Sequence, residues 1–369
     1  MYYWNIFTKV LIIYSFCYLK MEHNASYYTD LMKFCFSLPK IDLHAHLNGS
    51  IRKSTLYELL SETDREEISK LFENQMSFSN AFKVFSISSK ILKSLEVLRR
   101  ITREMIEDWA KTNCIYLEIR TSLKSLEGLG KEKYLRTVLE EILTGNNKHE
   151  MQTRLIISLN RCLPISDYVE TLEIFKNFRD EKLRPLIVGI DYSGFEEEEL
   201  HKYEDVIPIF NQFKELGLKV TLHMGESRIY QPLDFSTFKP ERVSHTYFFK
   251  ENECEEIMKN KIPIEICPTG SYNIKNLYSY MDIPFNNYHK KKIVGKDGEE
   301  FEYNLFCINT DDTMLFNTDL SQEYFEVALN FDIRKEELKQ IVFNTIDFIF
   351  ESNEDFRNNL KNKVEIFNI

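Results

Sequence analysis

The sequence of 369 residues predicts an α/β protein that folds as a (β/α)8 TIM barrel. Eight short runs rich in β-forming residues recur between residues 40 and 312, and amphipathic helical stretches such as YVETLEIFKNFRDEKL separate most of them. Strands that alternate with helices indicate βα units and a parallel sheet, and eight such units indicate a closed barrel. Nearly every run also ends in polar residues, as expected where barrel strands open onto a functional mouth.

The predicted strands span residues 40–47, 114–122, 153–160, 185–194, 218–226, 242–249, 262–270 and 305–312. The polar residues at their ends are His44, His46, Arg120, Asn160, Asp191, His223, Glu226, His245, Asp311 and Asp312. The alternative is an open nucleotide-binding sheet, which needs a glycine-rich turn after its first strand. The sequence HLNGSI is not such a turn, so the barrel is preferred.

The segment 52–112 is too long for one crossover, and its charged, helical pattern predicts extra helices over the mouth between strands 1 and 2. Phe78, Phe82 and Phe85 share one helical face in it. Such a stripe indicates burial in the core or, alternatively, a lid over a substrate. The tail from Gln322 onward predicts closing helices, so we assign residues 38–369 to the barrel domain.

Residues 1–37 are interpreted as an N-terminal extension. Their apolar run VLIIYSFCYL is too short to span a bilayer as a helix, although it resembles a signal-peptide core. The seven cysteines are scattered without CxxC pairs, which favours a reducing compartment over a disulfide framework. We therefore interpret the run as dispensable and expect a cytoplasmic protein, secreted only if the run is a working signal.

The charge of the chain limits the classes of ligand that we expect the protein to bind. The net charge is −11 with acidic and basic residues mixed along the chain, so there is no basic stripe of the kind that binds nucleic acid. A small phosphorylated ligand needs only one basic pocket and stays compatible with this charge. We expect a monomer that binds neither nucleic acid nor membrane.

The stretch PKIDLHAHLNGSI predicts a metal site. Side chains alternate along a strand, so His44 and His46 point the same way, into the barrel. His223 in HMGE and Asp311 in NTDD end two other strands. Three imidazoles and one carboxylate suit zinc. Barrels of the metal-dependent hydrolase type often bridge two ions through a lysine on the fourth strand; the fourth run here, PLIVGIDYSG, has none, so we expect one Zn2+ per chain.

Glu226, His245 and Asp312 stand beside these predicted ligands. A metal-activated water needs a base and a leaving group needs an acid. His245 is placed for the base, and Glu226 for the acid if burial keeps it protonated. Two alternatives stay open: Glu226 orients His223, or His245 is a further nitrogen ligand.

Six motifs in this order, HAHLNGS, GIDYSG, HMGE, VSHTYF, EICPTG and NTDD, resemble those of the adenosine/AMP deaminase family over about residues 38–350. The resemblance implies a zinc barrel that hydrolytically deaminates a 6-aminopurine nucleoside or nucleotide. By position it implies that His44, His46, His223 and Asp311 bind zinc, that Glu226 protonates the ring at N1, that His245 is the base, that Asp312 positions the attacking hydroxide, and that the backbone at Gly194 approaches the purine.

Within the family, Asn48 and the sequence LSQEY look like the adenosine-deaminase-like branch, which removes methylamine from N6-methyl-AMP. Adenosine deaminase proper usually has aspartate in place of Asn48, and an aspartate would repel a 5′-phosphate. In RTSLK (120–124), the residues Thr121, Ser122, Leu123 and Lys124 are expected to hold that phosphate. The alternative for this segment is an ordinary turn at the end of a strand.

The expected reaction is therefore conversion of N6-methyl-AMP to IMP and methylamine, with His46, Asn160 and Gly194 completing the substrate contacts. The alternatives are adenosine deaminase and, less favoured, a secreted adenosine-deaminase-related growth factor. The chain departs from the family pattern at Ser89, Asn160, Ser244, Thr246, Gly270 and Tyr272. None of these departures removes a predicted zinc ligand, and all of them bear on substrate choice.

Overall fold

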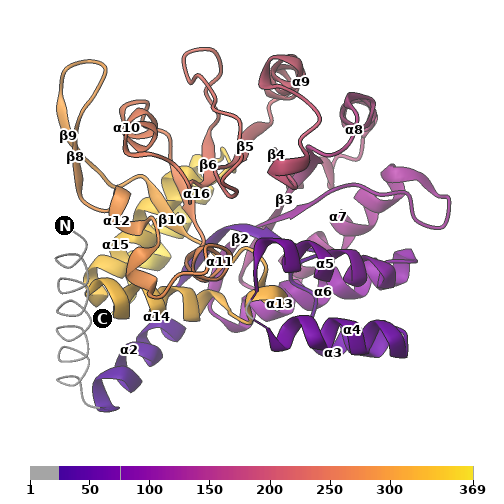
Figure 1. The fold of residues 1–369 in the computed structure, drawn as a ribbon, viewed down its shortest axis with the longest axis horizontal. Helices are drawn as coiled ribbons and strands as arrows, with labels where there is room; N and C mark the ends of the chain where they lie inside the picture. Colours follow the sequence, from indigo (N-terminus) through magenta and orange to yellow (C-terminus); the bar gives the residue numbers. More distant parts are fainter. Residues whose placement is uncertain (1–24, 75, 369) are drawn as a thin grey trace, which may run out of the picture.

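A computed structural model describes residues 25–74 and 76–368 (Figure 1). Eight parallel strands form one sheet in the order β1-β2-β3-β4-β5-β6-β7-β10. They are β1 Lys40–His46, β2 Cys114–Thr121, β3 Gln152–Asn160, β4 Ile187–Ser193, β5 Lys219–Met224, β6 Arg242–His245, β7 Ile264–Ile266 and β10 Phe306–Ile308. Every one lies within or overlaps a predicted run, and the (β/α)8 barrel is confirmed.

The barrel closes between its first and last strands. Ala45 in β1 pairs in parallel with Asp311, three residues beyond β10. The amide of His46 donates to the carbonyl of Asp311 (3.1 Å), and the amide of Asp311 donates to the carbonyl of His44 (2.8 Å). Closure therefore brings the Asp311 carboxylate beside the two histidines of β1, which lie more than 260 residues away in sequence.

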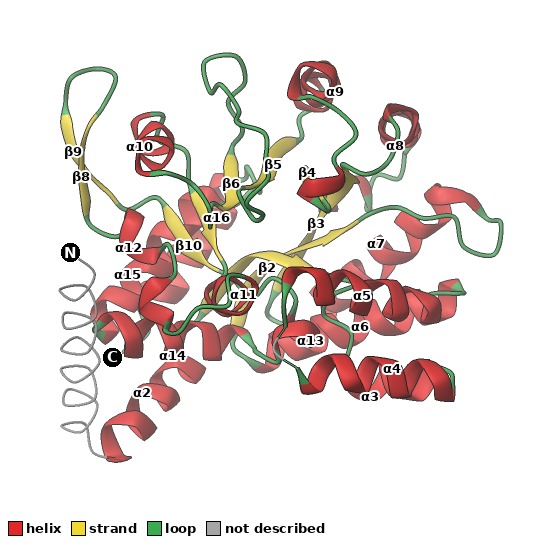
Figure 2. Ribbon diagram, viewed as in Figure 1, coloured by secondary structure: helices red, strands yellow, loops and turns green. Residues whose placement is uncertain are grey.

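Helices surround the strands (Figure 2). Those that follow the barrel strands are α6 Leu95–Lys111, α7 Gly130–Lys148, α8 Ile165–Asn177, α9 Tyr203–Glu215, α10 Glu251–Lys259, α11 Pro268–Ile274, α12 Phe285–Tyr288, α13 Thr313–Phe316, α14 Leu320–Phe331, α15 Lys335–Thr345 and α16 Glu354–Glu365. Single 3-10 turns are η1 Ser89–Ile91, η2 Arg184–Leu186, η3 Glu196–Glu198, η4 Tyr280–Asp282 and η5 Ile346–Phe348. In α6, Leu98, Ile101, Met105 and Trp109 recur at helical spacing and are buried, so this face packs on the barrel.

The extra helices between strands 1 and 2 are present as predicted. They are α3 Lys53–Leu59, α4 Glu62–Glu73 and α5 Phe78–Ser88. The interpretation of the α5 phenylalanines as a buried stripe is wrong: Phe78, Phe82 and Phe85 are only half-buried. Phe82 and Phe85 line a cavity, and Phe78 and Phe82 contact Phe195 beyond β4, with ring centroids 5.1 and 4.6 Å apart.

Helix α2 (Ala25–Ser37) leads into β1 and packs beside α14 (Figure 1). Its Leu31 and Cys35 are buried. The buried ammonium of Lys40 donates to the carbonyls of Cys35 (2.6 Å) and Leu38 (2.8 Å), which stabilises the carboxyl end of the helix. The apolar run of the predicted extension lies outside the described residues. Within the described ranges no helix is long and apolar enough to cross a bilayer.

One element was not predicted. Strands β8 (Lys291–Val294) and β9 (Glu300–Tyr303) pair antiparallel as a separate hairpin between α12 and β10, and the hairpin projects from the barrel (Figure 1). Its charged sequence KKKIVGKDGEEFEY lacks the apolar run that marks the barrel strands. The hairpin does not contribute to the cavity described below.

Candidate active site

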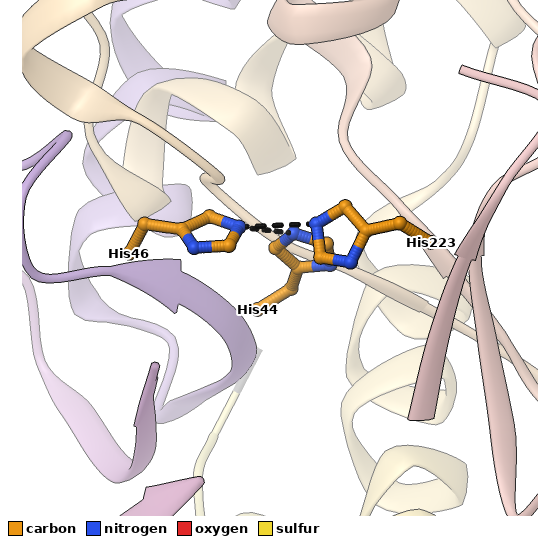
Figure 3. A group of neighbouring side chains, drawn as sticks. All are labelled: His44, His46 and His223. Carbon is orange, nitrogen blue, oxygen red and sulfur yellow. Dashed lines mark hydrogen bonds between the residues drawn. The ribbon is translucent and has the colours of Figure 1, made fainter. Parts of the chain in front are cut away.

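Three imidazoles converge at the mouth of the barrel, two from β1 and one from β5 (Figure 3). The Nε2 atom of His46 lies 3.1 Å from Nε2 of His44 and 3.1 Å from Nε2 of His223. The Asp311 Oδ1 atom lies 3.4 Å from His44 Nε2 and 3.5 Å from His46 Nε2. Four donors about 2 Å from one zinc ion would be about 3.3 Å apart, so the four predicted ligands fit such an ion.

Buried carboxylates orient two of these rings. The Nδ1 atom of His44 lies 2.8 Å from Glu265 Oε2, and that of His223 lies 2.8 Å from Asp191 Oδ1. Each carboxylate accepts the Nδ1 proton, so Nε2 keeps its lone pair toward the shared centre, as in metal sites. Buried Arg120 pairs with Glu265 and lies 3.4 Å from Asp191, so it holds both carboxylates in place.

Electrostatics keeps the imidazoles neutral. Burial lowers the pKa of His44 and of His223, and burial together with the neighbouring His223 lowers the pKa of His46 to about 3. Burial raises the pKa of Asp311 to about 7, against the opposing charge of Arg120. A metal ligand must be neutral imidazole or ionised carboxylate, so the imidazoles are prepared for an ion and Asp311 must first lose a proton.

His245, at the end of β6, presents an unoccupied nitrogen to this centre. The hydroxyl of Tyr247 donates to the Cys267 carbonyl (3.2 Å), so it accepts from His245 Nδ1 at 2.8 Å. The His245 Nε2 atom is buried with no hydrogen-bond partner in the described structure. His44, His245 and Asp311 each bring one ligand-type atom within 4.8 Å of the others. The Nε2 atom of His245 is therefore placed where it can act either as a base or as a further metal ligand.

Glu226 and Asp312 are the two remaining acidic groups. Burial and then the neighbouring Asp311 raise the pKa of Glu226 well above its usual range, and Glu196 adds to the effect. Burial, Asp311 and Glu226 likewise raise the pKa of Asp312. These shifts favour the protonated form of each carboxyl, which can donate a hydrogen bond. The Asp312 Oδ1 atom is also buried without a partner in the described structure.

A cavity of about 310 Å³ opens from this group. It is lined by His46, Asn48, Phe82, Phe85, Ser89, Arg120, Thr121, Ser122, Leu123, Lys124, Asn160, Gly194, His223, Glu226, Asp311 and Asp312, among others. All the residues predicted to contact substrate are thus brought together. His44 and His245 are buried behind the lining. A larger cavity of about 760 Å³ lies between α6, α13 and α14, where it is lined by residues such as Trp109 and Leu320.

The residues of the RTSLK segment differ in burial and in whether their polar groups already have partners. Thr121 is buried and shares a hydrogen bond with the Tyr134 hydroxyl (2.7 Å), so its hydroxyl already has a partner. Ser122 and Lys124 are half-buried on the cavity wall. Burial alone lowers the pKa of Lys124, and no acidic side chain of the described chain forms an ion pair with it. An anion in the cavity would supply the missing partner.

Gly194 follows β4 with φ +107°, a conformation that other residues rarely adopt. A Cβ atom at this position would also lie 2.4 Å from Asn160 Oδ1. The Asn160 oxygen accepts from the Cys162 amide (3.0 Å), so it fixes the following turn as well as lining the cavity. Gly194 itself lines the cavity, and the close approach of Asn160 leaves no room for a side chain at this position.

Comparison with known proteins decides the family. The family described as adenosine deaminase matches residues 39–366. The chain belongs to the adenosine deaminase family. It is 30% identical over 360 residues to the N6-mAMP deaminase of Arabidopsis thaliana, covering 88% of this chain and 95% of that protein. It is also 30% identical over 347 residues to an adenosine deaminase of Clostridium perfringens, covering 89% and 98%.

Solved structures of this adenosine deaminase family share the fold. The Arabidopsis ADAL complexed with GMP superposes with a TM-score of 0.77 at 28% identity, covering 90% of this chain and 98% of that one. The same protein complexed with IMP gives 0.76 with the same coverage. The protein is therefore a deaminase with the barrel of this family, and its metal-type histidine and aspartate group fits the metal dependence of the family.

Several functional residues were not predicted. Glu265, which orients His44, lies within the EICPTG motif, and its only signal was a charged residue in an otherwise apolar strand. Tyr247 lies two residues after His245, and Glu196 begins an acidic run after β4. A tyrosine or an acidic run at such positions has many ordinary explanations, so the pattern alone did not single them out.

Proposed function

We propose that the protein converts N6-methyl-AMP and water to IMP and methylamine. The observation that supports a nucleotide substrate is the position of Lys124 on the wall of the cavity that opens from the metal-type site. This half-buried cation has no acidic partner among residues 25–74 and 76–368. Burying an unpaired charge is unfavourable unless a ligand compensates it. A 5′-phosphate would do so, and the similarity to the Arabidopsis N6-mAMP deaminase supports the same substrate.

In this proposal His44, His46, His223 and Asp311 hold one Zn2+, which activates a water molecule as a nucleophile when bound. His245 Nε2 accepts the proton that this water loses. Tyr247 occupies the other nitrogen of the ring, so the free nitrogen faces the centre. Asp312, whose Oδ1 atom is free, orients the nucleophile.

The protonated Glu226 donates to N1 of the purine, which makes C6 electrophilic. Collapse of the tetrahedral centre breaks the bond from C6 to nitrogen, and methylamine leaves with a proton returned by the site. The hydroxyl proton on the C6 oxygen passes to Glu226 and restores its protonated form, while His245 gives the proton that it took from water to methylamine. IMP thus keeps the oxygen of water at C6 and the Glu226 proton at N1, and both hydrogens of the water are accounted for. No oxidant or reductant is required.

The remaining cavity residues set the orientation of the substrate. Ser122 and Lys124 hold the phosphate, and Leu123 contributes apolar contact. Asn48 is neutral, so it does not repel the phosphate. Gly194 has no side chain, so the edge of the purine can approach its backbone. Phe82 and Phe85 of α5 line the cavity and contribute apolar contacts.

The alternative is adenosine deaminase, favoured by the similarity to the Clostridium perfringens enzyme. A comparison of kcat/KM for N6-methyl-AMP, AMP and adenosine on zinc-loaded protein separates the two. We expect N6-methyl-AMP to be the best of the three. Adenosine as the best substrate would refute the nucleotide proposal while leaving the deaminase assignment intact.

A further inference from the structure

The loop after β5 carries Glu226 and is held by a carboxylate from another strand end. Glu196, in η3 after β4, accepts from the Gly225 amide through Oε1 (2.9 Å) and from the Ser227 amide through Oε2 (2.7 Å). These two amides lie immediately before and after Glu226 in the chain. The two carboxylate oxygens of Glu196 thus accept hydrogen bonds from the backbone on either side of Glu226.

Glu196 is itself buried and anchored. Its exposed fraction is 4%, and Arg161 Nη1 lies 3.4 Å from its Oε1 atom. The same guanidinium donates through Nη2 to the carbonyls of His223 (2.7 Å) and Tyr192 (3.2 Å). Arg161 therefore connects the end of β5, where His223 projects into the metal-type site, to the carboxylate that grips the following loop.

The loop needs such support because no sheet positions it. Strand β5 ends at Met224 and β6 begins only at Arg242, and no helix or strand lies between them. Side chains on irregular segments are less firmly placed than side chains on strands. A catalytic acid must nevertheless stay within a fraction of an ångström of its target, since an error of about 1 Å can cost about 100-fold in rate.

We infer that Glu196 is a positioning residue for the reaction: by fixing the amides of Gly225 and Ser227 it aims the Glu226 carboxyl at the purine. This inference rests on the acid role given to Glu226 in the proposed function. A glutamate suits the task because its two oxygens both accept. A glutamine offers one oxygen, and its NH2 group would face an N–H donor.

The test substitutes Glu196→Gln, with Glu197→Gln as the matched control. Glu197 is the exposed neighbour, and within the described part of the chain its side chain accepts one hydrogen bond, from the Ser227 hydroxyl (2.6 Å). The assay measures kcat and KM for whichever purine substrate the wild type uses best, together with zinc content and Tm. For E196Q we expect kcat at least tenfold lower, KM within about threefold and unchanged zinc. E197Q should stay within about twofold of wild type.

A double variant tests whether the effect of Glu196 on kcat depends on Glu226. If Glu196 acts only through Glu226, the kcat of E196Q/E226Q should equal that of E226Q alone. A further large loss in the double variant would overturn the inference, as would an E196Q enzyme that keeps more than half of the wild-type kcat. Loss of zinc and Tm in parallel with kcat would make Glu196 a folding residue and also overturn it. An active E226Q enzyme would instead refute the acid role in the proposed function, separately from any result at Glu196.

Discussion

Replacement of Lys124 by alanine is the sharpest test of the proposed nucleotide specificity. The lysine lies half-buried on the cavity wall, burial lowers its pKa, and no acidic side chain of the described residues pairs with it. A hydrogen bond to a charged partner is worth about 1.5–3 kcal/mol. We therefore expect K124A to lower kcat/KM for N6-methyl-AMP about 10- to 150-fold.

Two further measurements make this outcome specific. The kcat/KM for adenosine, which carries no phosphate, should change by less than about threefold. The Tm should stay constant or rise, because the substitution removes a half-buried charge that forms no ion pair within the part of the chain that the structure describes. Lys131→Ala is the matched control: Lys131 pairs with Asp167 (2.5 Å) and Glu170 (2.8 Å) and does not line the cavity, so its loss should leave both substrates unaffected.

An equal fall in kcat/KM for the nucleotide and the nucleoside would contradict the phosphate contact. In that case the RTSLK segment is an ordinary strand-end turn that supports the cavity, and the phosphate contact has to be abandoned. Asn48→Asp gives an independent check, since a negative charge on the cavity wall should weaken use of N6-methyl-AMP more than use of adenosine while zinc stays bound.

Three other predictions concern the centre itself. Glu226→Gln should keep zinc but lower kcat by about 100-fold or more, because an amide cannot deliver the proton to N1; a variant with more than about a tenth of the wild-type rate would show that Glu226 only supports its neighbours. His44→Ala should lose metal and activity together, and metal analysis of the wild type should give one zinc per chain, so two tightly bound ions would contradict the single site. Zinc affinity of the metal-stripped protein should rise about tenfold per pH unit up to about pH 7 and then level off, because the Asp311 carboxyl, with a pKa of about 7, must release one proton to bind the ion while His46, with a pKa of about 3, is already neutral. A competition titration with a chelator between pH 5 and 8 measures this slope, and a flat profile would show that Asp311 is not a ligand.

Much of the site followed from the order of residues along single strands. The two-residue period of β1 places His44 and His46 on one face whatever surrounds the strand. Parallel strands bring their carboxyl ends to one mouth, so His223, His245 and Asp311 could be gathered there before any distance was known. The phosphate expected near the neutral Asn48 and the basic Lys124, by contrast, was suggested by the resemblance to the nucleotide-using branch of the family.

Other features depended on which side chains meet across the barrel. A helical stripe such as Phe78, Phe82 and Phe85 has the same period whether it faces a core or a cavity, and only packing against Phe195 showed which. The hydroxyl of Thr121 looked available for a ligand until Tyr134 was found beside it. Arg120 ends a predicted strand, and only the structure showed that its buried guanidinium pairs with Glu265 and Asp191.

The barrel, the four metal-type donors and the acidic and basic groups around them could be predicted from the sequence, because these depend on local periodicity and on the chemistry of each residue. Only the folded chain showed which nitrogen of His44, His223 and His245 faces the centre and which carboxyl pKa values burial raises. It also showed that Glu196 accepts hydrogen bonds from the loop of Glu226. Hydrogen-bond partners and burial depend on contacts between residues from distant strands, so they cannot be predicted from the residue pattern of a single strand.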